Sequence, residues 1–331
     1  MKQEILSRIQ KNFPLVQKPF KQIADELGMS EDEVLKILQE EKGKNIIRQT
    51  SAIFDTKRLG YQSSLVAFEV EAEQIDEAVK VINSHPGVSH NYERNHSFNI
   101  WFTMAVPADS VLGLEKTIEL LAKLTKAKDS IILPTLKLFK ISVKLNTTGK
   151  DKKKEKVKKQ NFKKMELTPF HYDVVREAQK DLKMISEPFG AMVAELGISY
   201  EKFFATLKEF QEAGVMRRFA SILNHRKAGF NANAMVVWDI EEKDGVEIGE
   251  AVAKFSAVSH CYLRPKYQNW KYNLFSMIHG KTTEETNGII DEIADEIEYK
   301  SYKSLYSSRE FKKVRIQYFS PEFAKWEKSN I

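Results

Sequence analysis

Residues 88–94 read VSHNYER and residues 258–264 read VSHCYLR. An apolar segment follows each of them, FNIWF at 98–102 and YNLFS at 272–276, with four extra residues before the second one. Alternate side chains of a β-strand share a face, so each seven-residue stretch predicts a strand with its His, Tyr and Arg on one side. A motif that recurs in the same order and at one spacing indicates internal duplication.

The repeat extends upstream of these strands. Residues 19–69 align on residues 188–238 without a gap, and eleven positions are identical. They include the glycines expected to end one helix and the serines expected to cap the next: Gly28, Gly197, Ser30 and Ser199. Glu33 adds the capping-box position in copy one only. Two helices, this Gly-x-Ser turn and a third helix predict a helix-turn-helix in each copy.

Strands and helices alternate after each helix-turn-helix, which predicts a βαββαβ unit. In copy one we expect strands at 46–54, 63–70, 87–94, 98–106 and 131–143, and helices at 74–84 and 110–122. In copy two we expect strands at 215–223, 232–240, 257–264, 271–279 and 299–306, and helices at 246–254 and 284–296. The predicted fold class is α+β, a tandem duplication in which each copy is a winged helix-turn-helix followed by a ferredoxin-like βαββαβ unit. The expected domains are 1–62, 63–143, 165–231 and 232–331, with a linker at 144–164.

Basic residues concentrate in this expected linker. Residues 144–164 carry ten lysines against Asp151 and Glu155, a local charge of +8, whereas the whole 331-residue chain carries +6. The two copies themselves are therefore close to neutral, at −2. A lysine-rich tract with little apolar content is expected to be a disordered, self-repelling spacer, with accessory anion binding as the alternative.

Composition excludes several classes of protein. Apolar residues make up 42% of the chain and charged residues 30%, which favours a packed core over global disorder. The sequence has no run of 18 apolar residues, and it opens into an amphipathic helix rather than a signal segment. Cys261 is the only cysteine, so a disulfide framework and cysteine-based metal sites are excluded. We expect a cytoplasmic protein.

Three long stretches surround the repeated motifs: HPGVSHNYERNHSFNIWFT at 85–103, RRFASILNHRKAGFNANAMVVW at 217–238 and VSHCYLRPKYQNWKYNLFSMIHG at 258–280. They resemble the siroheme decarboxylases, which are relatives of the Lrp/AsnC regulators, and the resemblance covers nearly all of the chain except the linker. In that family two related subunits usually pair, whereas here both would lie on one chain.

The resemblance implies an activity. It implies removal of carbon dioxide from the C12 and C18 acetate side chains of siroheme, which gives 12,18-didecarboxysiroheme for alternative heme or nitrite-reductase heme biosynthesis. It implies no separate cofactor, because siroheme with its iron is the substrate.

The helix-turn-helix provides a test of DNA binding. A recognition helix that faces phosphates is expected to carry Lys and Arg. Residues 31–41 instead hold five acids and one lysine, and residues 200–213 are slightly acidic. Protein–protein packing is the better interpretation of both helices, so we expect no DNA partner. An Lrp/AsnC-type regulator that senses heme or binds DNA is the alternative function.

A flat iron tetrapyrrole with carboxylates at its rim requires imidazole, for iron ligation or proton donation, and guanidinium or ammonium groups for its carboxylates. Copy two concentrates such residues. The candidate catalytic residues are His225, His260, Tyr262 and His279, and either His225 or His260 is the candidate ligand of the substrate iron. The candidate substrate-binding residues are Arg217, Arg218, Lys227, Arg264, Tyr267, Trp270 and Tyr272. The plain alternative is that the histidines are structural and the aromatic residues belong to the core.

Copy one offers a smaller set. It has Thr56 where copy two has His225, and it lacks the insertion that contains Tyr267 and Trp270. Candidates for a second pocket, either weaker or purely structural, are Arg48, His90, Tyr92, Arg94 and His96. We predict one principal site, built mainly from copy two, in a pseudo-dimer whose halves dock through their sheets. A non-catalytic tetrapyrrole carrier is a third hypothesis, which these residues do not distinguish from an enzyme.

Overall fold

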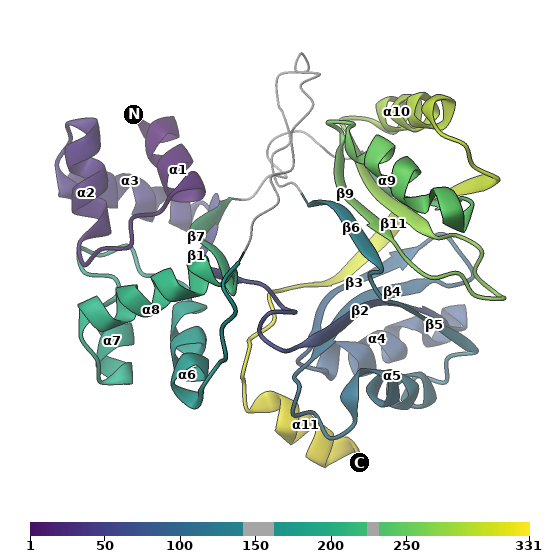
Figure 1. The fold of residues 1–331 in the computed structure, drawn as a ribbon, viewed down its shortest axis with the longest axis horizontal. Helices are drawn as coiled ribbons and strands as arrows, with labels where there is room; N and C mark the ends of the chain where they lie inside the picture. The colour runs from purple at the N-terminus through teal and green to yellow at the C-terminus, as the bar shows by residue number, and fades with distance from the viewer. Residues whose placement is uncertain (142–161, 224–231) are drawn as a thin grey trace. The chain divides into compact units, whose positions relative to one another are not determined.

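The computed structural model describes residues 1–141, 162–223 and 232–331 (Figure 1). The chain divides into two compact units, and each contains parts of both copies. Unit 1 comprises residues 1–61, 159–224 and 317–321, and unit 2 comprises the rest. The helix-turn-helix segments therefore gather in one unit and the βαββαβ segments in the other.

Unit 1 contains two three-helix sets, each followed by a strand. Copy one supplies α1 (Lys2–Lys11), α2 (Pro19–Leu27), α3 (Glu31–Gly43) and β1 (Ile47–Phe54). Copy two supplies α6 (Pro169–Ala178), α7 (Gly190–Leu196), α8 (Tyr200–Glu212) and β7 (Met216–Leu223). Gly28 and Gly197 end α2 and α7 with φ of 66° and 62°, in the left-handed region that glycine tolerates. The Ser30 and Ser199 hydroxyls accept hydrogen bonds from the backbone N–H three residues later, as the sequence predicts.

Strands β1 and β7 pair antiparallel and join the two helix sets (Figure 1). At the centre of this ladder the buried hydroxyls of Thr50 and Ser221 lie 2.6 Å apart. Phe13 of copy one packs against Phe189 and Phe219 of copy two, with ring centroids 6.3 and 5.3 Å apart. Aromatic burial of this kind stabilises the association of the two helix-turn-helix segments.

The acidic helix α3 contacts copy two. Lys42 Nζ lies 2.6 Å from the Asp181 carboxylate, and the Gln39 side-chain amide donates a hydrogen bond of 2.9 Å to the Met184 carbonyl. The Thr50 backbone N–H also donates to Asp181, at 2.9 Å. The C-terminal half of α3 therefore takes part in packing between the copies, as expected from its acidic sequence.

The segment predicted as a lysine-rich spacer lies mostly outside the described residues. At its C-terminal end the Arg58 guanidinium lies 4.4 Å from the centroid of the Phe162 ring, and Lys163 forms an ion pair of 2.6 Å with Glu212. This end of the segment is therefore packed against unit 1.

Unit 2 contains both βαββαβ segments. Copy one supplies β2 (Gln62–Glu69), α4 (Ile75–Ser84), β3 (Val88–Arg94), β4 (Ile100–Val106), α5 (Gly113–Leu124), β5 (Asp129–Leu133) and β6 (Lys137–Ile141). Copy two supplies β8 (Ala232–Asp239), α9 (Gly245–Ala253), β9 (Val258–Leu263), β10 (Leu274–Gly280), α10 (Thr283–Glu296), β11 (Ser301–Lys313) and α11 (Glu322–Asn330). Within the described residues the strands of this unit are hydrogen-bonded in the order β5-β2-β4-β3-β11-β8-β10-β9-β6.

The two copies exchange strands in this unit. The single strand expected at 131–143 is divided at Pro134, because proline has no N–H to continue a ladder. As a result β5 pairs with β2 of its own copy, and β6 pairs with β9 of copy two. The strand expected at 299–306 runs on to Lys313, and β11 pairs first with β8 and then with β3 of copy one.

Matching lysines secure the exchanged strands. Lys140 on β6 donates a hydrogen bond of 2.8 Å to the Phe255 carbonyl, just after α9. Lys312 on β11 donates one of 2.7 Å to the Asn83 carbonyl in the last turn of α4. Both cations lie where the carbonyl end of a helix attracts positive charge, so each copy binds the end of the other copy's helix.

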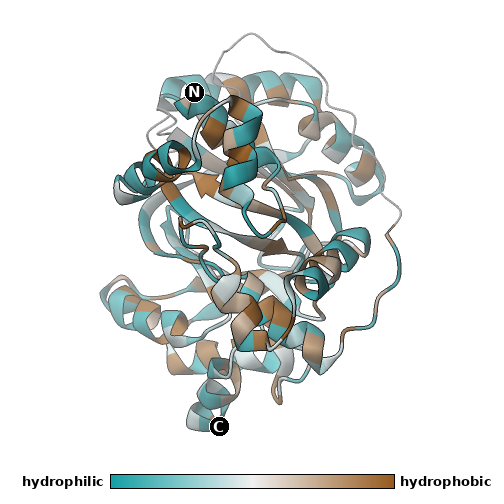
Figure 2. Cartoon of the chain, turned by 90° about the vertical axis from the view of Figure 1, so that its left-hand side faces the viewer, coloured by the Kyte–Doolittle hydropathy of each residue, from teal (hydrophilic) through white to brown (hydrophobic). Residues whose placement is uncertain are grey.

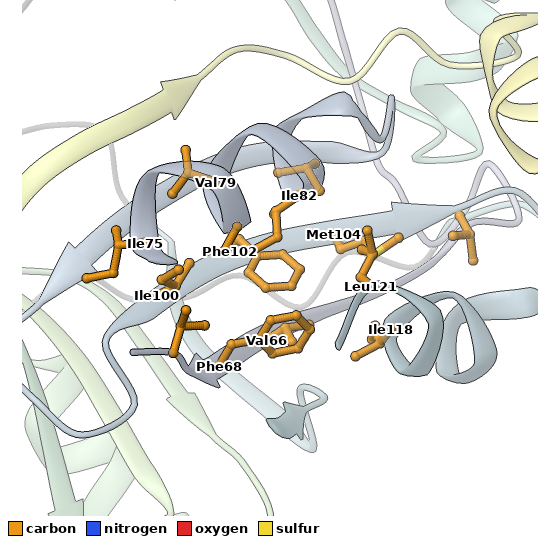
Figure 3. Close-up of a cluster of buried hydrophobic side chains, with 14 of the residues drawn as sticks. Val66, Phe68, Ile75, Val79, Ile82, Ile100, Phe102, Met104, Ile118 and Leu121 are labelled. Carbon is orange, nitrogen blue, oxygen red and sulfur yellow. The ribbon is translucent and has the colours of Figure 1, made fainter. Parts of the chain in front are cut away.

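Three apolar cores stabilise unit 2. In the outer core of copy one, Ile75, Val79 and Ile82 of α4 form one buried cluster with Ile100 and Phe102 of β4 (Figure 3). A second outer core lies between the copy two strands and the helices α9 and α10. Between the copies, a central core joins residues of both copies: Ala67, Phe98, Trp101, Ile131, Leu133, Met235, Val237, Trp270, Phe275 and Leu305. The expected docking of the copies through their sheets is therefore observed.

The helices are amphipathic, and Figure 2 shows brown apolar residues interspersed with teal polar residues along them. No helix among the described residues is long and apolar enough to span a membrane.

Helix α11 was not predicted from the sequence, because it lies outside the repeat. The Trp326 ring centroid lies 4.4 Å from that of His85, and Trp326 Nε1 donates a hydrogen bond of 3.0 Å to Ser84 Oγ. The Glu327 carboxylate accepts from the backbone N–H groups of Val111 and Leu112 at 3.2 and 3.3 Å, close to the start of α5. These contacts attach α11 to copy one.

Candidate functional site

His260 and Tyr262 on β9 form a row with Arg264, which directly follows the strand, as strand alternation predicts. The rings of His260 and Tyr262 are stacked, with centroids 6.1 Å apart and planes inclined at 22°. The Arg264 guanidinium carbon lies 4.8 Å from the Tyr262 centroid. Cys261 points the other way, into the outer core of copy two, where burial raises the pKa of its thiol to about 12. This cysteine is therefore not a nucleophile at neutral pH.

Beside this row, four side chains from three neighbouring strands form a chain of hydrogen bonds. His260 Nδ1 lies 2.8 Å from Ser259 Oγ, and Ser259 Oγ lies 2.6 Å from His279 Nε2. His279 Nδ1 lies 2.7 Å from Asn233 Oδ1. Strand β10 runs between β8 and β9 and places His279 directly opposite Asn233. The register of the sheet thus brings together two of the predicted catalytic histidines.

Both imidazoles are neutral at neutral pH. Burial lowers the pKa of His260 below its usual value. Burial, together with the nearby His260 and Lys313, lowers the pKa of His279 to about 4. A neutral imidazole has one N–H donor and one nitrogen lone pair, so each ring offers both a donor and an acceptor.

Arg264 is a buried cation that has no carboxylate partner among the described residues. Its side chain is 7% exposed, and Nη1 donates to the Leu133 carbonyl and lies 3.3 Å from Thr135 Oγ1. Nε has no hydrogen-bond partner in the described ranges. Burial lowers its pKa to about 10, so the guanidinium stays protonated at neutral pH. A buried charged donor without an acceptor is costly. The site therefore suits an anionic group of a ligand.

Copy one repeats the row. The rings of His90 and Tyr92 are stacked with centroids 6.3 Å apart, and the Arg94 guanidinium carbon lies 5.5 Å from the Tyr92 centroid. Arg94 is also 7% exposed, it donates a hydrogen bond of 2.8 Å to the Leu305 carbonyl, and its Nε has no partner in the described part of the chain. The duplication has therefore preserved the geometry of the row.

Copy one does not repeat the chain of hydrogen bonds. Ser89 Oγ lies 3.0 Å from His90 Nδ1, which matches the first link. In the ladder between β2 and β4, however, the residues at the places of Asn233 and His279 are Ser63 and Ala105. An alanine has no polar group, so the chain cannot continue beyond Ser89.

The insertion of copy two contributes to the central core. Trp270 is 2% exposed, and its ring centroid lies 5.1 to 5.3 Å from those of Tyr272, Trp101 and His96. The Tyr267 hydroxyl donates a hydrogen bond of 2.5 Å to the Ile132 carbonyl on β5. These contacts attach copy two to the β5 edge of copy one. They favour the core interpretation of Trp270, which retains little surface for a ligand.

The remaining candidates belong to other parts of the chain. Arg48, Arg217 and Arg218 belong to unit 1, on β1 and β7, and Arg217 forms an ion pair of 2.9 Å with Asp55. His225 and Lys227 lie outside the described residues. The structure thus brings together His260, Tyr262, Arg264 and His279, all in unit 2.

Two further features of the described residues bear on ligands. A surface hollow of about 520 Å³ lies in unit 1 beside α1 and the end of α2, and its lining includes Arg8 and Leu27 but none of the predicted site residues. In the same described ranges no three His, Cys, Asp or Glu side chains are grouped to hold a metal ion.

Comparison with known proteins identifies the family. The AsnC-like ligand binding domain family matches residues 58–140 and 227–312, and the siroheme decarboxylase NirDL-like HTH domain family matches residues 2–48. A siroheme decarboxylase of Hydrogenobacter thermophilus is 40% identical over 328 residues, which cover 99% of this chain and 98% of that protein. This chain belongs to the siroheme decarboxylase family.

Other members of the siroheme decarboxylase family clarify the duplication. The beta subunit of the siroheme decarboxylase of Methanosarcina barkeri is 37% identical over 144 residues, which cover 95% of that subunit but 44% of this chain. The fusion of two related subunits is therefore confirmed. This chain superposes on the crystal structure of the siroheme decarboxylase NirDL with a TM-score of 0.80 and 36% sequence identity. The superposition covers 99% of this chain and 97% of the NirDL chain. A second structure of NirDL is a co-complex with an iron-uroporphyrin III analogue.

Sequence reasoning missed Ser259 and Asn233 of the hydrogen-bond chain. Neither is charged or aromatic, so neither is distinctive as a residue type. One signal was available for the serine, because a serine precedes the strand histidine in both copies, at Ser89 and at Ser259. The role of Asn233 depends on the register of β8 against β10, which the sequence does not reveal.

Proposed function

We infer that this chain acts as a siroheme decarboxylase, which removes carbon dioxide from the C12 and C18 acetate side chains of siroheme and forms 12,18-didecarboxysiroheme. The observation that carries this inference is the 40% identity to a siroheme decarboxylase along nearly its whole length. The row of imidazole, phenol and guanidinium on β9 supplies the groups that such a substrate requires. The alternative of a transcription regulator gains no support from these relatives.

Arg264 is proposed to hold a carboxylate of the substrate. Its buried Nε lacks an acceptor in the described part of the chain, and a carboxylate oxygen would provide one. An ion pair stabilises a carboxylate in its charged form, which opposes its departure as carbon dioxide. Arg264 therefore suits a carboxylate that stays on the macrocycle rather than an acetate that reacts.

The chemistry requires a proton but no electron transfer. Each decarboxylation breaks the bond between the acetate CH₂ and its carboxylate carbon and releases carbon dioxide. The electron pair of that bond passes into a protonated pyrrole ring, and a proton is then added to the CH₂ carbon to complete the methyl group. The ring finally gives up the proton that activated it, so each decarboxylation consumes one proton overall. Because the step is redox-neutral, we propose no cofactor besides the substrate itself. The candidates for proton donor remain His225, His260, Tyr262 and His279.

We further propose that the helix-turn-helix segments serve in packing rather than in DNA recognition. The acidic α3 contacts copy two through Gln39 and Lys42. An acidic surface also repels phosphates. A sequence-specific gel shift with the intact chain would contradict this proposal. The expected location in the cytoplasm remains a prediction.

Anaerobic incubation of the intact chain with siroheme, followed by mass spectrometry of the tetrapyrrole, tests the proposed function. The expected product has lost two carbon dioxide units. Siroheme that stays unchanged but bound would indicate a carrier and contradict the decarboxylase. Siroheme that neither reacts nor binds would contradict both.

A further inference from the structure

The two partly buried histidines of copy two, His260 and His279, differ in how many of their ring nitrogens are already hydrogen-bonded within the protein. Both ring nitrogens of His279 have side-chain partners, Asn233 Oδ1 at 2.7 Å and Ser259 Oγ at 2.6 Å. His260 uses only Nδ1, which lies 2.8 Å from Ser259 Oγ. Among the described residues no group is hydrogen-bonded to His260 Nε2. His279 can therefore bind a ligand only if it gives up one of its two hydrogen bonds. His260 can bind a ligand through Nε2 and keep its hydrogen bond to Ser259.

The direction of the hydrogen bonds follows from Asn233. An amide oxygen only accepts, so His279 Nδ1 carries the proton and donates it to Asn233 Oδ1. His279 Nε2 then has the lone pair and accepts from the Ser259 hydroxyl. The Ser259 oxygen, having donated its hydrogen, accepts from His260 Nδ1–H. The consequence is a His260 ring with its proton on Nδ1 and a lone pair on Nε2.

We propose that Asn233, His279 and Ser259 are positioning residues that hold the His260 proton on Nδ1, so that Nε2 of His260 is the ligand for the iron of siroheme. The proposal rests on the proposed function, since it requires an iron tetrapyrrole as substrate. Histidines that bind metals usually donate their other ring N–H to a fixed acceptor, which sets the tautomer and the orientation of the ring. Ser259 is such an acceptor. His279 is then a positioning residue and not the proton donor.

Copy one supplies an internal control for this assignment. Its Ser89–His90 pair matches Ser259–His260, but Ala105 stands where His279 stands in copy two. Among the described residues no imidazole takes the place of His279 beside the Ser89 hydroxyl. The chain of partners that sets the tautomer of His260 is therefore not repeated in copy one.

The tautomer can be measured without siroheme. Two-dimensional NMR of the intact chain with ¹⁵N-labelled histidine separates protonated from unprotonated ring nitrogens, and a His260→Gln variant assigns the signals. We expect an unprotonated Nε2 on His260 in the natural chain, and a mixture of tautomers in Ser259→Ala and Asn233→Leu. Asn233→Asp should restore the single tautomer, because a carboxylate also accepts from His279 Nδ1. A protonated His260 Nε2 in the natural chain would overturn the proposal.

Iron ligation is tested by titration with ferric iron uroporphyrin III, followed by visible absorption and electron paramagnetic resonance. We expect a histidine-ligated spectrum that is lost in His260→Ala and retained in Ser89→Ala. In Ser259→Ala and Asn233→Leu the affinity should fall by about 10- to 100-fold, the range for partners of a ligating histidine. An unchanged spectrum in His260→Ala would overturn the assignment of the ligand. If instead the spectra behave as expected but siroheme is not decarboxylated, only the proposed function fails.

Discussion

The two copies of the repeat share a row of His, Tyr and Arg but differ in what surrounds it. In copy two the row is linked through Ser259 to His279, whereas copy one has Ala105 at that place. Copy two also carries the insertion that places Trp270 in the central core. The comparison suggests that duplication preserved a scaffold in both copies, while the polar support needed for chemistry is present in one.

The difference has a physical basis. The His, Tyr and Arg of each row pack against one another, and this packing alone accounts for their presence in both copies. A chain of partly buried polar side chains is stabilising only when each donor meets an acceptor, so it places stricter demands on its members than packing does. The complete chain in copy two is therefore a stronger indication of an active site than the row itself.

The largest expected effect concerns the insertion, which only copy two has. Trp270→Ala should lower the free energy of unfolding by about 3–5 kcal/mol, because it removes a fully enclosed ring from the core between the copies. Urea unfolding followed by far-ultraviolet circular dichroism measures this loss. Tyr267→Phe is the matched variant, and it should cost about 0.5–1.5 kcal/mol, since it removes one hydrogen bond. Equal small losses from both variants would show that the insertion does not hold the copies together.

The next effect compares the two buried arginines. Arg264→Met should weaken siroheme binding by about 10- to 100-fold, since a hydrogen bond to a charged group contributes about 1.5–3 kcal/mol. Arg94→Met, which alters the matching place in copy one, should weaken binding clearly less. Dissociation constants from anaerobic absorption titrations give both values, and circular dichroism verifies that both variants fold. Equal weakening would indicate two equivalent carboxylate sites.

The smallest expected effect is a pH dependence of the free energy of unfolding, caused by His85 of copy one. Burial and the nearby Lys312 lower the pKa of His85 to about 3, whereas an unfolded histidine titrates near 6.5. Between these values the unfolded chain binds more protons, so the free energy of unfolding falls as pH falls below about 6.5. Copy two has Phe255 at the matching place. His85→Phe should therefore reduce the loss of stability between pH 7 and 5.5 by about 1 kcal/mol.

Urea unfolding of the natural chain and His85→Phe at the two pH values measures this difference. The difference between pH values is the informative quantity, because the substitution also removes the acceptor for the Gly87 N–H. An identical pH dependence in both proteins would show that His85 is not the group responsible.

Local features of the fold could be predicted from the sequence. The turn glycines and capping serines act within a few residues, so Gly28 and Ser30 could be recognised from their neighbours. The row of His260, Tyr262 and Arg264 follows from the two-residue period of a strand. The family followed from long motifs that occur in both copies.

Features that depend on contacts between the copies could not be predicted. The break at Pro134 is visible in the sequence, but the pairing of the following strand with copy two is not. The sequence leaves open whether Trp270 binds substrate or belongs to the core, because nothing near it in the sequence indicates that Trp101 and His96 surround it. Asn233 entered the site only through the register of two strands.

The central claim is that one principal active site lies in copy two, and it is tested most directly by comparing the turnover of His260→Ala with that of His90→Ala. Both variants alter the same position of the repeat, and both are assayed anaerobically with siroheme after circular dichroism has verified folding. We predict that His260→Ala lowers turnover by about 10²-fold or more, the scale for losing the correct placement of the substrate. His90→Ala should lower it clearly less. Equal losses would show two equivalent sites and contradict the claim.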